Sequence, residues 1–184
     1  MSDVLDSCTE RMNKSISALK DELNSIRTGR ASASIFDKIR VDYYGDKSPL
    51  SQVATISIPE ARSVIIQPWD KALIGEIEKA IQKSELGLNP SNDGKVIRIS
   101  IPPLTADRRK ELVKQAKNIA EQSRVAIRNI RRDGNDELKK LQKEGTITED
   151  GLKTSEDTLQ KSTDKFIAEI NKIFDDKEKE IMEG

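Results

Sequence analysis

The first 30 residues carry apolar side chains at every third or fourth position. The series is Leu5, Cys8, Met12, Ile16, Leu19, Leu23 and Ile26. Side chains at this spacing lie on one face of an α-helix. The pattern therefore predicts an amphipathic helix that ends near Thr28-Gly29, because glycine is common just after a helix C-terminus.

The last 80 residues predict two more helices with the same periodicity. The first opens at Thr105, a good N-cap, and the second opens near Thr148-Glu149-Asp150. The stripe of the first runs through Leu112, Ala116, Ile119, Ser123, Ile127, Ile130, Gly134, Leu138 and Leu141. A helix of nearly 40 residues is about 60 Å long, so three such helices can bury their stripes only against one another. We expect an elongated antiparallel three-helix bundle.

The middle of the chain has a different pattern. All six prolines lie between Pro49 and Pro103. The stretches KIRVDYYG and VATISIP alternate apolar and polar residues, and SVIIQP and KVIRISIP are rich in β-branched residues, as strands are. WDKALIGEIEKAIQKSE has the spacing of a short helix. The fold class expected is α+β: residues 1–30 and 105–184 form the bundle, and 31–104 form an inserted small β/α/β domain.

Two connections join the expected domains, residues 28–32 and 101–104. Because both connecting segments must bend together, motion of one domain relative to the other would be hinge-like. The hinge candidates are Thr28, Gly29, Pro102 and Pro103. A rigid corner is the alternative.

Composition argues against catalysis by the chain alone. It has no histidine, one cysteine, no phosphate-binding glycine loop and no nucleophile elbow. We therefore expect no enzyme, no catalytic residue, no metal site and no cofactor. There is no apolar run long enough for a membrane span, and the N-terminus is polar, so we expect a soluble cytoplasmic protein without a membrane partner.

Positive charge is concentrated in the second predicted helix. The chain has 32 basic and 32 acidic residues, yet residues 105–145 carry 12 basic and 7 acidic side chains, and 146–184 carry 6 and 11. On a helical wheel the basic residues flank the apolar stripe on one side, with Glu121 as the only acid among them. Arg124, Arg128 and Arg131 form a ridge at i, i+4 and i+7, and Arg132 projects furthest from the core.

Three interpretations of this ridge remain open. It is a binding face for nucleic acid, since arginine suits phosphate contacts; it pairs with the acidic third helix; or it only aids solubility. The interleaved residues are aliphatic, which argues against base stacking. A helical adaptor that binds proteins through the acidic helix is the competing functional class.

Six stretches, in order along the whole chain, resemble the bacterial ribosome-recycling factor family. They are IRTGRAS, DYYG followed by Pro49-Leu50, LGLNP, IPPLTADRR, RVAIRNIRRD and DKEKEIM. Ala106 departs from the pattern, since the family often has an acid there. The resemblance implies a fold of two domains in an L shape, joined by a two-strand hinge. It implies binding to the post-termination ribosome at the subunit interface and, with the GTPase elongation factor G, disassembly of that complex for recycling.

The resemblance also implies roles for particular residues. Arg128 and Arg131 match the family's principal contacts to large-subunit rRNA, and Arg124 and Arg132 flank them. Arg27, Arg30 and Arg109 are expected as secondary rRNA contacts. The GTPase would hydrolyse the nucleotide, and the chain itself is expected to act as a monomer.

Overall fold

The computed structural model describes residues 2–183. They divide into two compact units: the described residues up to Arg27 together with Ala106–Glu183, and Thr28–Thr105. Each unit has a hydrophobic core of its own. No helix among residues 2–183 is long and apolar enough to cross a membrane.

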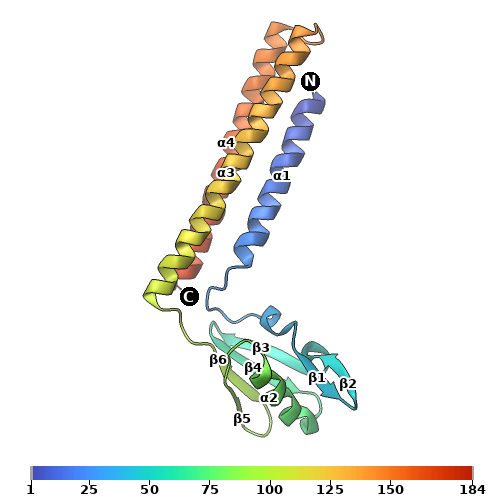
Figure 1. Cartoon of the computed structure of the whole chain (residues 1–184), viewed down its shortest axis with the longest axis vertical. Coiled ribbons are helices and arrows are strands. Elements are labelled where there is room, and N and C mark those ends of the chain that lie inside the picture. Colours follow the sequence, from blue (N-terminus) through green and yellow to red (C-terminus); the bar gives the residue numbers. More distant parts are fainter. Residues whose placement is uncertain (1, 184) are drawn as a thin grey trace. The chain divides into compact units, whose positions relative to one another are not determined.

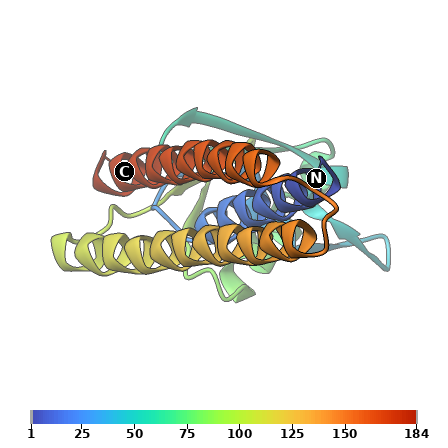
Figure 2. The ribbon, with the colours of Figure 1, turned by 90° about the horizontal axis from the view of Figure 1, so that it is seen from above.

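Three long helices form the first unit, as the periodicity predicted. They are α1 (Ser2–Asn24), α3 (Ala106–Lys143) and α4 (Glu149–Glu183). All three pairs of helices are in contact, and α3 runs antiparallel to α1 and α4 (Figures 1 and 2). The start of α4 is capped as expected, because the Thr148 hydroxyl accepts a hydrogen bond from the Gly151 N–H at 3.0 Å. α1 ends at Asn24, slightly earlier than predicted.

The core of the helical unit follows the predicted stripes with small shifts. On α1 it contains Val4 instead of Leu5, and on α3 Ala120 is buried while Ile119 is only half-buried. Lys177 of α4 also lies in the buried stripe, with its ammonium group 3.3 Å from Glu180. A lysine stem can cover apolar surface while its charge keeps a partner, so an apolar pattern alone does not reveal this position.

Gly134 of α3 lies directly against side chains of both other long helices. A Cβ atom added to it would lie 2.6 Å from the sulfur of Cys8 on α1 and 2.8 Å from a methyl carbon of Leu159 on α4. Real Cβ atoms essentially never come so near to a neighbour. The mid-helix glycine, unfavourable by about 1 kcal/mol for an isolated helix, is therefore explained by packing.

The second unit contains two antiparallel sheets, one α-helix and three short 3-10 helices, Ala33–Phe36, Leu50–Gln52 and Lys71–Leu73. Strands β1 (Arg40–Tyr43) and β2 (Asp46–Pro49) form a hairpin. The other sheet has four strands in the order β3-β4-β6-β5. Its strands are β3 (Ala54–Glu60), β4 (Ser63–Pro68), β5 (Pro90–Asn92) and β6 (Ile97–Ser100). The helix α2 (Ile74–Lys83) lies between β4 and β5 in the chain.

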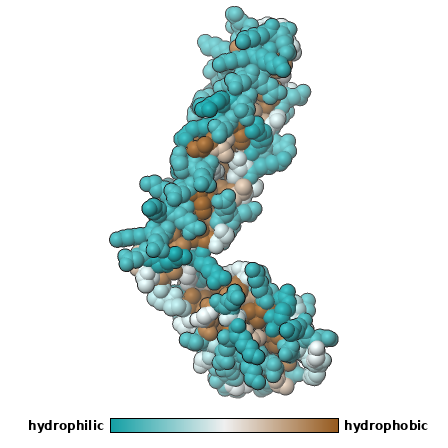
Figure 3. Space-filling model, viewed as in Figure 1, coloured by the Kyte–Doolittle hydropathy of each residue, from teal (hydrophilic) through white to brown (hydrophobic). Residues whose placement is uncertain are grey.

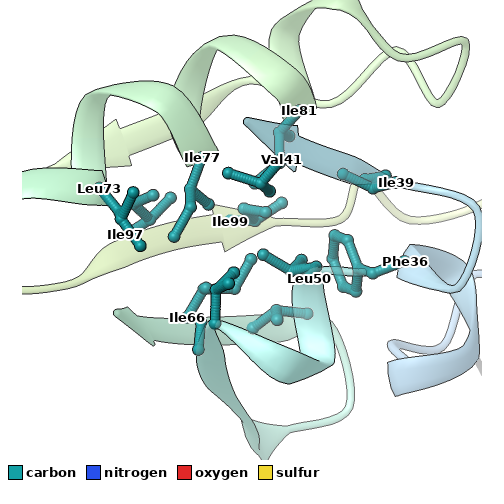
Figure 4. Close-up of a cluster of buried hydrophobic side chains, with 13 residues drawn as sticks. Phe36, Ile39, Val41, Leu50, Ile66, Leu73, Ile77, Ile81, Ile97 and Ile99 are labelled. Atoms are coloured by element: carbon teal, nitrogen blue, oxygen red, sulfur yellow. The ribbon is translucent and has the colours of Figure 1, made fainter. Parts of the chain in front are cut away.

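Isoleucines from the sheet and from α2 make most of this second core. Ile77 and Ile81 of α2 point toward Ile97 and Ile99 of β6 and toward Val41 of β1 (Figure 4). Alternation in the sequence predicted β1 and β3, and β-branched runs predicted β4 and β6. The sequence missed β2 and β5, because DKSP and PSN carry no apolar alternation and their pairing with β1 and β6 depends on the tertiary structure. The predicted α+β class is confirmed.

We predict that Gly134→Ala destabilises the protein although alanine favours helix. The added methyl group has to displace Cys8 or Leu159, and overpacking of this kind costs about 1–3 kcal/mol, more than the helix propensity gained. Urea denaturation followed by circular dichroism measures the change.

Gly75→Ala is the matched control, since Gly75 lies in α2 with no atom within 4 Å of an added Cβ. It is expected to be neutral or to stabilise by up to about 1 kcal/mol. A Gly134→Ala protein as stable as this control would show that the three helices are not held at this contact.

Candidate nucleic-acid interface

The four clustered arginines lie on α3 beside its buried stripe. Ile127, Ile130 and Gly134 face the core, and this orientation places the arginine ridge at the edge of the α3–α4 contact. The side chain of Arg124 is 18% exposed and that of Arg128 45% exposed. Arg131 is half-buried, whereas Arg132 is exposed. A regular helix therefore holds the guanidinium groups in a row at the surface.

The contacts of this ridge to α4 are made with neutral amides. Arg124 donates from Nε to the Asn171 side-chain oxygen at 2.8 Å, and Arg131 donates from Nη1 to the Gln160 side-chain oxygen at 3.0 Å. Gln160 in turn donates to Asp164 at 2.9 Å. Amide acceptors fix the orientation of a guanidinium group but do not neutralise its charge. The acidic α4 thus orients two of the arginines without forming an ion pair with them.

Glu121 is the one carboxylate that forms ion pairs with the arginine cluster in the described chain. Its Oε2 lies 2.9 Å from Arg124 Nη1, and its Oε1 lies 3.4 Å from Arg128 Nη1. The hydrogen bond from Arg124, and then the charge of that arginine and the contact with Arg128, lower the pKa of Glu121. Glu121 therefore stays ionised at neutral pH, and its negative charge offsets one positive charge of the arginine ridge.

Arg132 differs from its three neighbours. It is exposed, and no hydrogen bond or ion pair of its side chain is found within residues 2–183. Its neighbour Asp133 faces α1 and pairs with Arg11 at 3.2 Å. Arg132 is thus free of the contacts that orient Arg124 and Arg131.

The surface around the ridge offers charge more than apolar area. Hydrophilic side chains predominate on the face of the helical unit drawn in Figure 3. Val125 and Met182 are the large apolar side chains of this unit that are found exposed, at 45% and 50%. A partner of α3 would be recognised chiefly through its charge and hydrogen-bonding groups.

The other predicted arginines have different surroundings. Arg109 is half-buried and donates to the Met182 carbonyl at 2.7 Å, so it joins the start of α3 to the last turn of α4. Arg27 and Arg30 are exposed, on either side of the predicted hinge residues Thr28 and Gly29. Arg109 therefore has a structural contact, whereas no side-chain hydrogen bond or ion pair of Arg27 or Arg30 is found within residues 2–183.

The predicted hinge residues lie in two segments held at one end of the second unit. The Ala31 N–H donates to the Ala61 carbonyl at 2.6 Å, and the Ile101 N–H donates to the Arg62 carbonyl at 2.8 Å. Both segments are thus attached to the turn between β3 and β4. Residues between these hydrogen bonds and the helix ends are where bending is possible, and Pro102 and Pro103 are exposed there.

Gly29 connects the two segments. Its φ is +79°, a conformation that other residues adopt only with strain, and an added Cβ would lie 3.2 Å from Cγ of Leu104. Leu104 belongs to the second segment. The space beside Gly29 is thus occupied by the side chain of Leu104.

The potential metal ligands of the described chain are dispersed, and its single cysteine is buried. Within residues 2–183 no three histidine, cysteine or carboxylate side chains are grouped so that they could hold a metal ion. Cys8 is 3% exposed, and burial is the main cause that raises its pKa, so its thiol stays protonated and inaccessible at neutral pH.

Comparison with known proteins decides the family. The sequence model of the family described as Ribosome recycling factor matches residues 19–182. The chain belongs to this family. Among similar proteins, the ribosome-recycling factor of Treponema denticola is 65% identical over 182 residues, which cover 99% of this chain and 98% of that one. That of Brevibacillus brevis is 57% identical over 180 residues, 98% and 97% of the two chains. The resemblance drawn from the sequence is confirmed.

Solved structures of the family have the same fold. A solution structure of a ribosome recycling factor matches with a TM-score of 0.70 and 43% identity, over 100% of this chain and 97% of that one. The T. thermophilus ribosome recycling factor, described with the E. coli elongation factor G bound to the E. coli post-termination complex, matches with a TM-score of 0.60 and 46% identity, over 98% and 97%.

The sequence indicated the arginines but not the groups that hold them. Glu121 was visible as the one acid on the basic flank, and its positions i−3 and i−7 from Arg124 and Arg128 could have indicated the ion pairs. Asn171 and Gln160 carried no such signal, because their contacts depend on the antiparallel register of α3 and α4.

Proposed function

We propose that this chain binds the post-termination ribosome and, with elongation factor G, disassembles it so that the ribosome can be used again. Membership of the ribosome recycling factor family supports this proposal, as does similarity to a family member described with elongation factor G and a post-termination complex. The chain acts as a non-enzymatic cytoplasmic factor and a monomer, and the partner GTPase supplies the energy. No cofactor enters the proposal.

The observation that carries the proposal is the charge left on the arginine ridge. Of the contacts to α4, those of Arg124 and Arg131 go to amide oxygens, so the acidic helix does not neutralise them. This favours the nucleic-acid interpretation over internal pairing. Arginines held in a row can make bidentate contacts to RNA phosphates, which a flexible cluster would make only at a cost in entropy.

The individual arginines have unequal roles in this proposal. Arg128 and Arg131 make the principal contacts to large-subunit rRNA, and Arg124 and Arg132 extend the contact along α3. Arg27 and Arg30 are secondary contacts near the connecting segments. Arg109 contributes least to RNA binding, because one of its Nη groups is already bonded to Met182.

The two units have separate tasks in this proposal. The helical unit anchors the chain on rRNA, while elongation factor G acts on the second unit, and the segments around Thr28, Gly29, Pro102 and Pro103 form the hinge. The Gly29–Leu104 contact supports a hinge whose two segments move together.

Light scattering of post-termination ribosomes tests the activity. Addition of this chain, elongation factor G and GTP together should lower the scattering as the subunits separate, and omission of any one of the three should abolish most of the change. Splitting by elongation factor G and GTP at the same rate without the chain would contradict the proposed function.

Arg128→Ala and Arg131→Ala should each weaken binding to ribosomes by about tenfold, since each removes a charge-assisted contact. Each should also make the dependence of log affinity on log salt shallower by about one, the value for one phosphate contact. Equilibrium binding at several salt concentrations gives both quantities.

Arg11→Ala is the matched control, because Arg11 is an exposed arginine of the same unit that is paired with Asp133 on another face. It should bind as wild type does. Equal affinity and salt dependence for Arg131→Ala and wild type would refute the anchoring role and would favour the adaptor function.

Pro102→Gly should reduce splitting more than it reduces ribosome affinity. Proline restricts the backbone of this exposed segment. Glycine would make the segment flexible, so that force applied by elongation factor G to the second unit would reach the helical unit less effectively. The arginine ridge is unchanged in this variant. The rate from light scattering and the dissociation constant are compared for the same protein. Losses of equal size in both would count against a hinge at this position.

A further inference from the structure

We propose that Glu121 competes with RNA phosphates for Arg128 and thereby limits the affinity of the arginine ridge. This inference rests on the proposed function, since it concerns how tightly the same surface holds RNA. It assigns a tuning role to an acidic side chain within a basic surface.

The geometry makes Glu121 a substitute for a phosphate group. Its two carboxylate oxygens are directed to different arginines, Oε2 to Arg124 at 2.9 Å and Oε1 to Arg128 at 3.4 Å. A phosphate offers the same kind of charged oxygen acceptor to the same guanidinium groups. While Glu121 occupies them, the ridge presents one positive charge fewer to an RNA.

Arg128 is the arginine most able to exchange Glu121 for phosphate. Its side chain is 45% exposed, that of Glu121 is 54% exposed, and their contact is the longer of the two. Exposed pairs contribute little to stability, so replacement of this contact by a phosphate is easy. Arg128 makes no hydrogen bond to α4 in the described chain that would restrain it.

Arg124 is held more firmly and keeps its position during this exchange. It is only 18% exposed, and its Nε–H is bonded to Asn171 in addition to the contact with Glu121. Glu121 can therefore stay beside Arg124 when Arg128 leaves it. The carboxylate then lies next to the bound phosphate and repels it, which opposes tight binding.

The consequence is a surface that binds RNA reversibly. A factor that acts repeatedly has to dissociate after each event, and an internal anion that recaptures Arg128 favours dissociation. Removal of the carboxylate charge should therefore raise affinity, in contrast to removal of an arginine.

The test compares binding of wild type, Glu121→Gln, Arg128→Ala and the double variant Glu121→Gln/Arg128→Ala to purified 70S ribosomes. Glu121→Gln should bind about three- to tenfold more tightly at low salt, because the exposed pair with Arg128 no longer competes with phosphate and no carboxylate charge repels the bound phosphate. Its affinity should fall more steeply with salt, because more phosphate charge is neutralised. In the Arg128→Ala background, the fold-increase in affinity caused by Glu121→Gln should be less than half of that in the wild-type background.

Glu137→Gln is the control for net charge, because it removes one carboxylate charge from an exposed residue of α3 on the flank away from the arginine ridge. It should change affinity less than twofold. A gain as large as that of Glu121→Gln would show a general charge effect and would overturn the inference. Thermal unfolding monitored by circular dichroism verifies that all variants fold.

Other outcomes separate this inference from the proposed function. If Arg128→Ala weakens binding but Glu121→Gln leaves it unchanged or weakens it, Glu121 orients the arginines and the competition is refuted, while the proposed function stands. If Arg128→Ala and Arg131→Ala both bind as wild type does, the anchoring surface is wrong and this inference fails with it.

Discussion

The close approach of three helices at Gly134 is the constraint on which the helical unit depends. Because Gly134 has no side chain, the sulfur of Cys8 and a methyl group of Leu159 occupy the space that a Cβ would fill. Packed cores resist displacements of a few tenths of an ångström, so this contact fixes how far α1 and α4 can slide along α3. A glycine that weakens an isolated helix is thus a position where side chains of both neighbouring helices pack directly against the backbone of α3.

The register of α4 along α3 determines which side chains of α4 lie opposite the arginines. Leu159 precedes Gln160 in the chain, and Arg131 lies about one turn before Gly134, so the glycine contact and the Arg131–Gln160 hydrogen bond are neighbours. Asn171 meets Arg124 further along the same antiparallel pair. A shift of α4 by one residue would rotate these amides away and place a neighbouring aliphatic or lysine side chain, Leu159 or Lys161 and Ile170 or Lys172, opposite the arginines. The neutral character of the cross-helix contacts therefore follows from the packing at the core.

Elements that depend on local periodicity could be predicted from the sequence. Features that depend on contacts between distant parts of the chain could not. The three long helices, α2, β1 and β3 follow from apolar spacing, β4 and β6 follow from β-branched runs, and the arginine ridge follows from the helical wheel. β2 and β5 were missed because their residues lack that spacing, and Lys177 was missed because a buried lysine depends on its stem and on Glu180. Asn171 and Gln160 could not be found without the register. The importance of Gly134 was also hidden, since the sequence showed its cost and not the contact that explains it.

The distribution of charge has a further consequence for recognition. Basic and acidic residues are equal in number over the whole chain, so it has little long-range attraction for nucleic acid, and salt screens surface charges beyond about 8 Å at physiological ionic strength. The arginine ridge can act only at short range, where the spacing of guanidinium groups along a rigid helix has to match the spacing of phosphates. Such a surface discriminates by shape: a folded RNA with suitably placed phosphates gains several contacts together, whereas a flexible strand pays in entropy for each one. Under the RNA anchoring proposed for the arginine ridge, neutral overall charge and a locally rigid basic surface are thus complementary requirements for selecting one RNA surface among many.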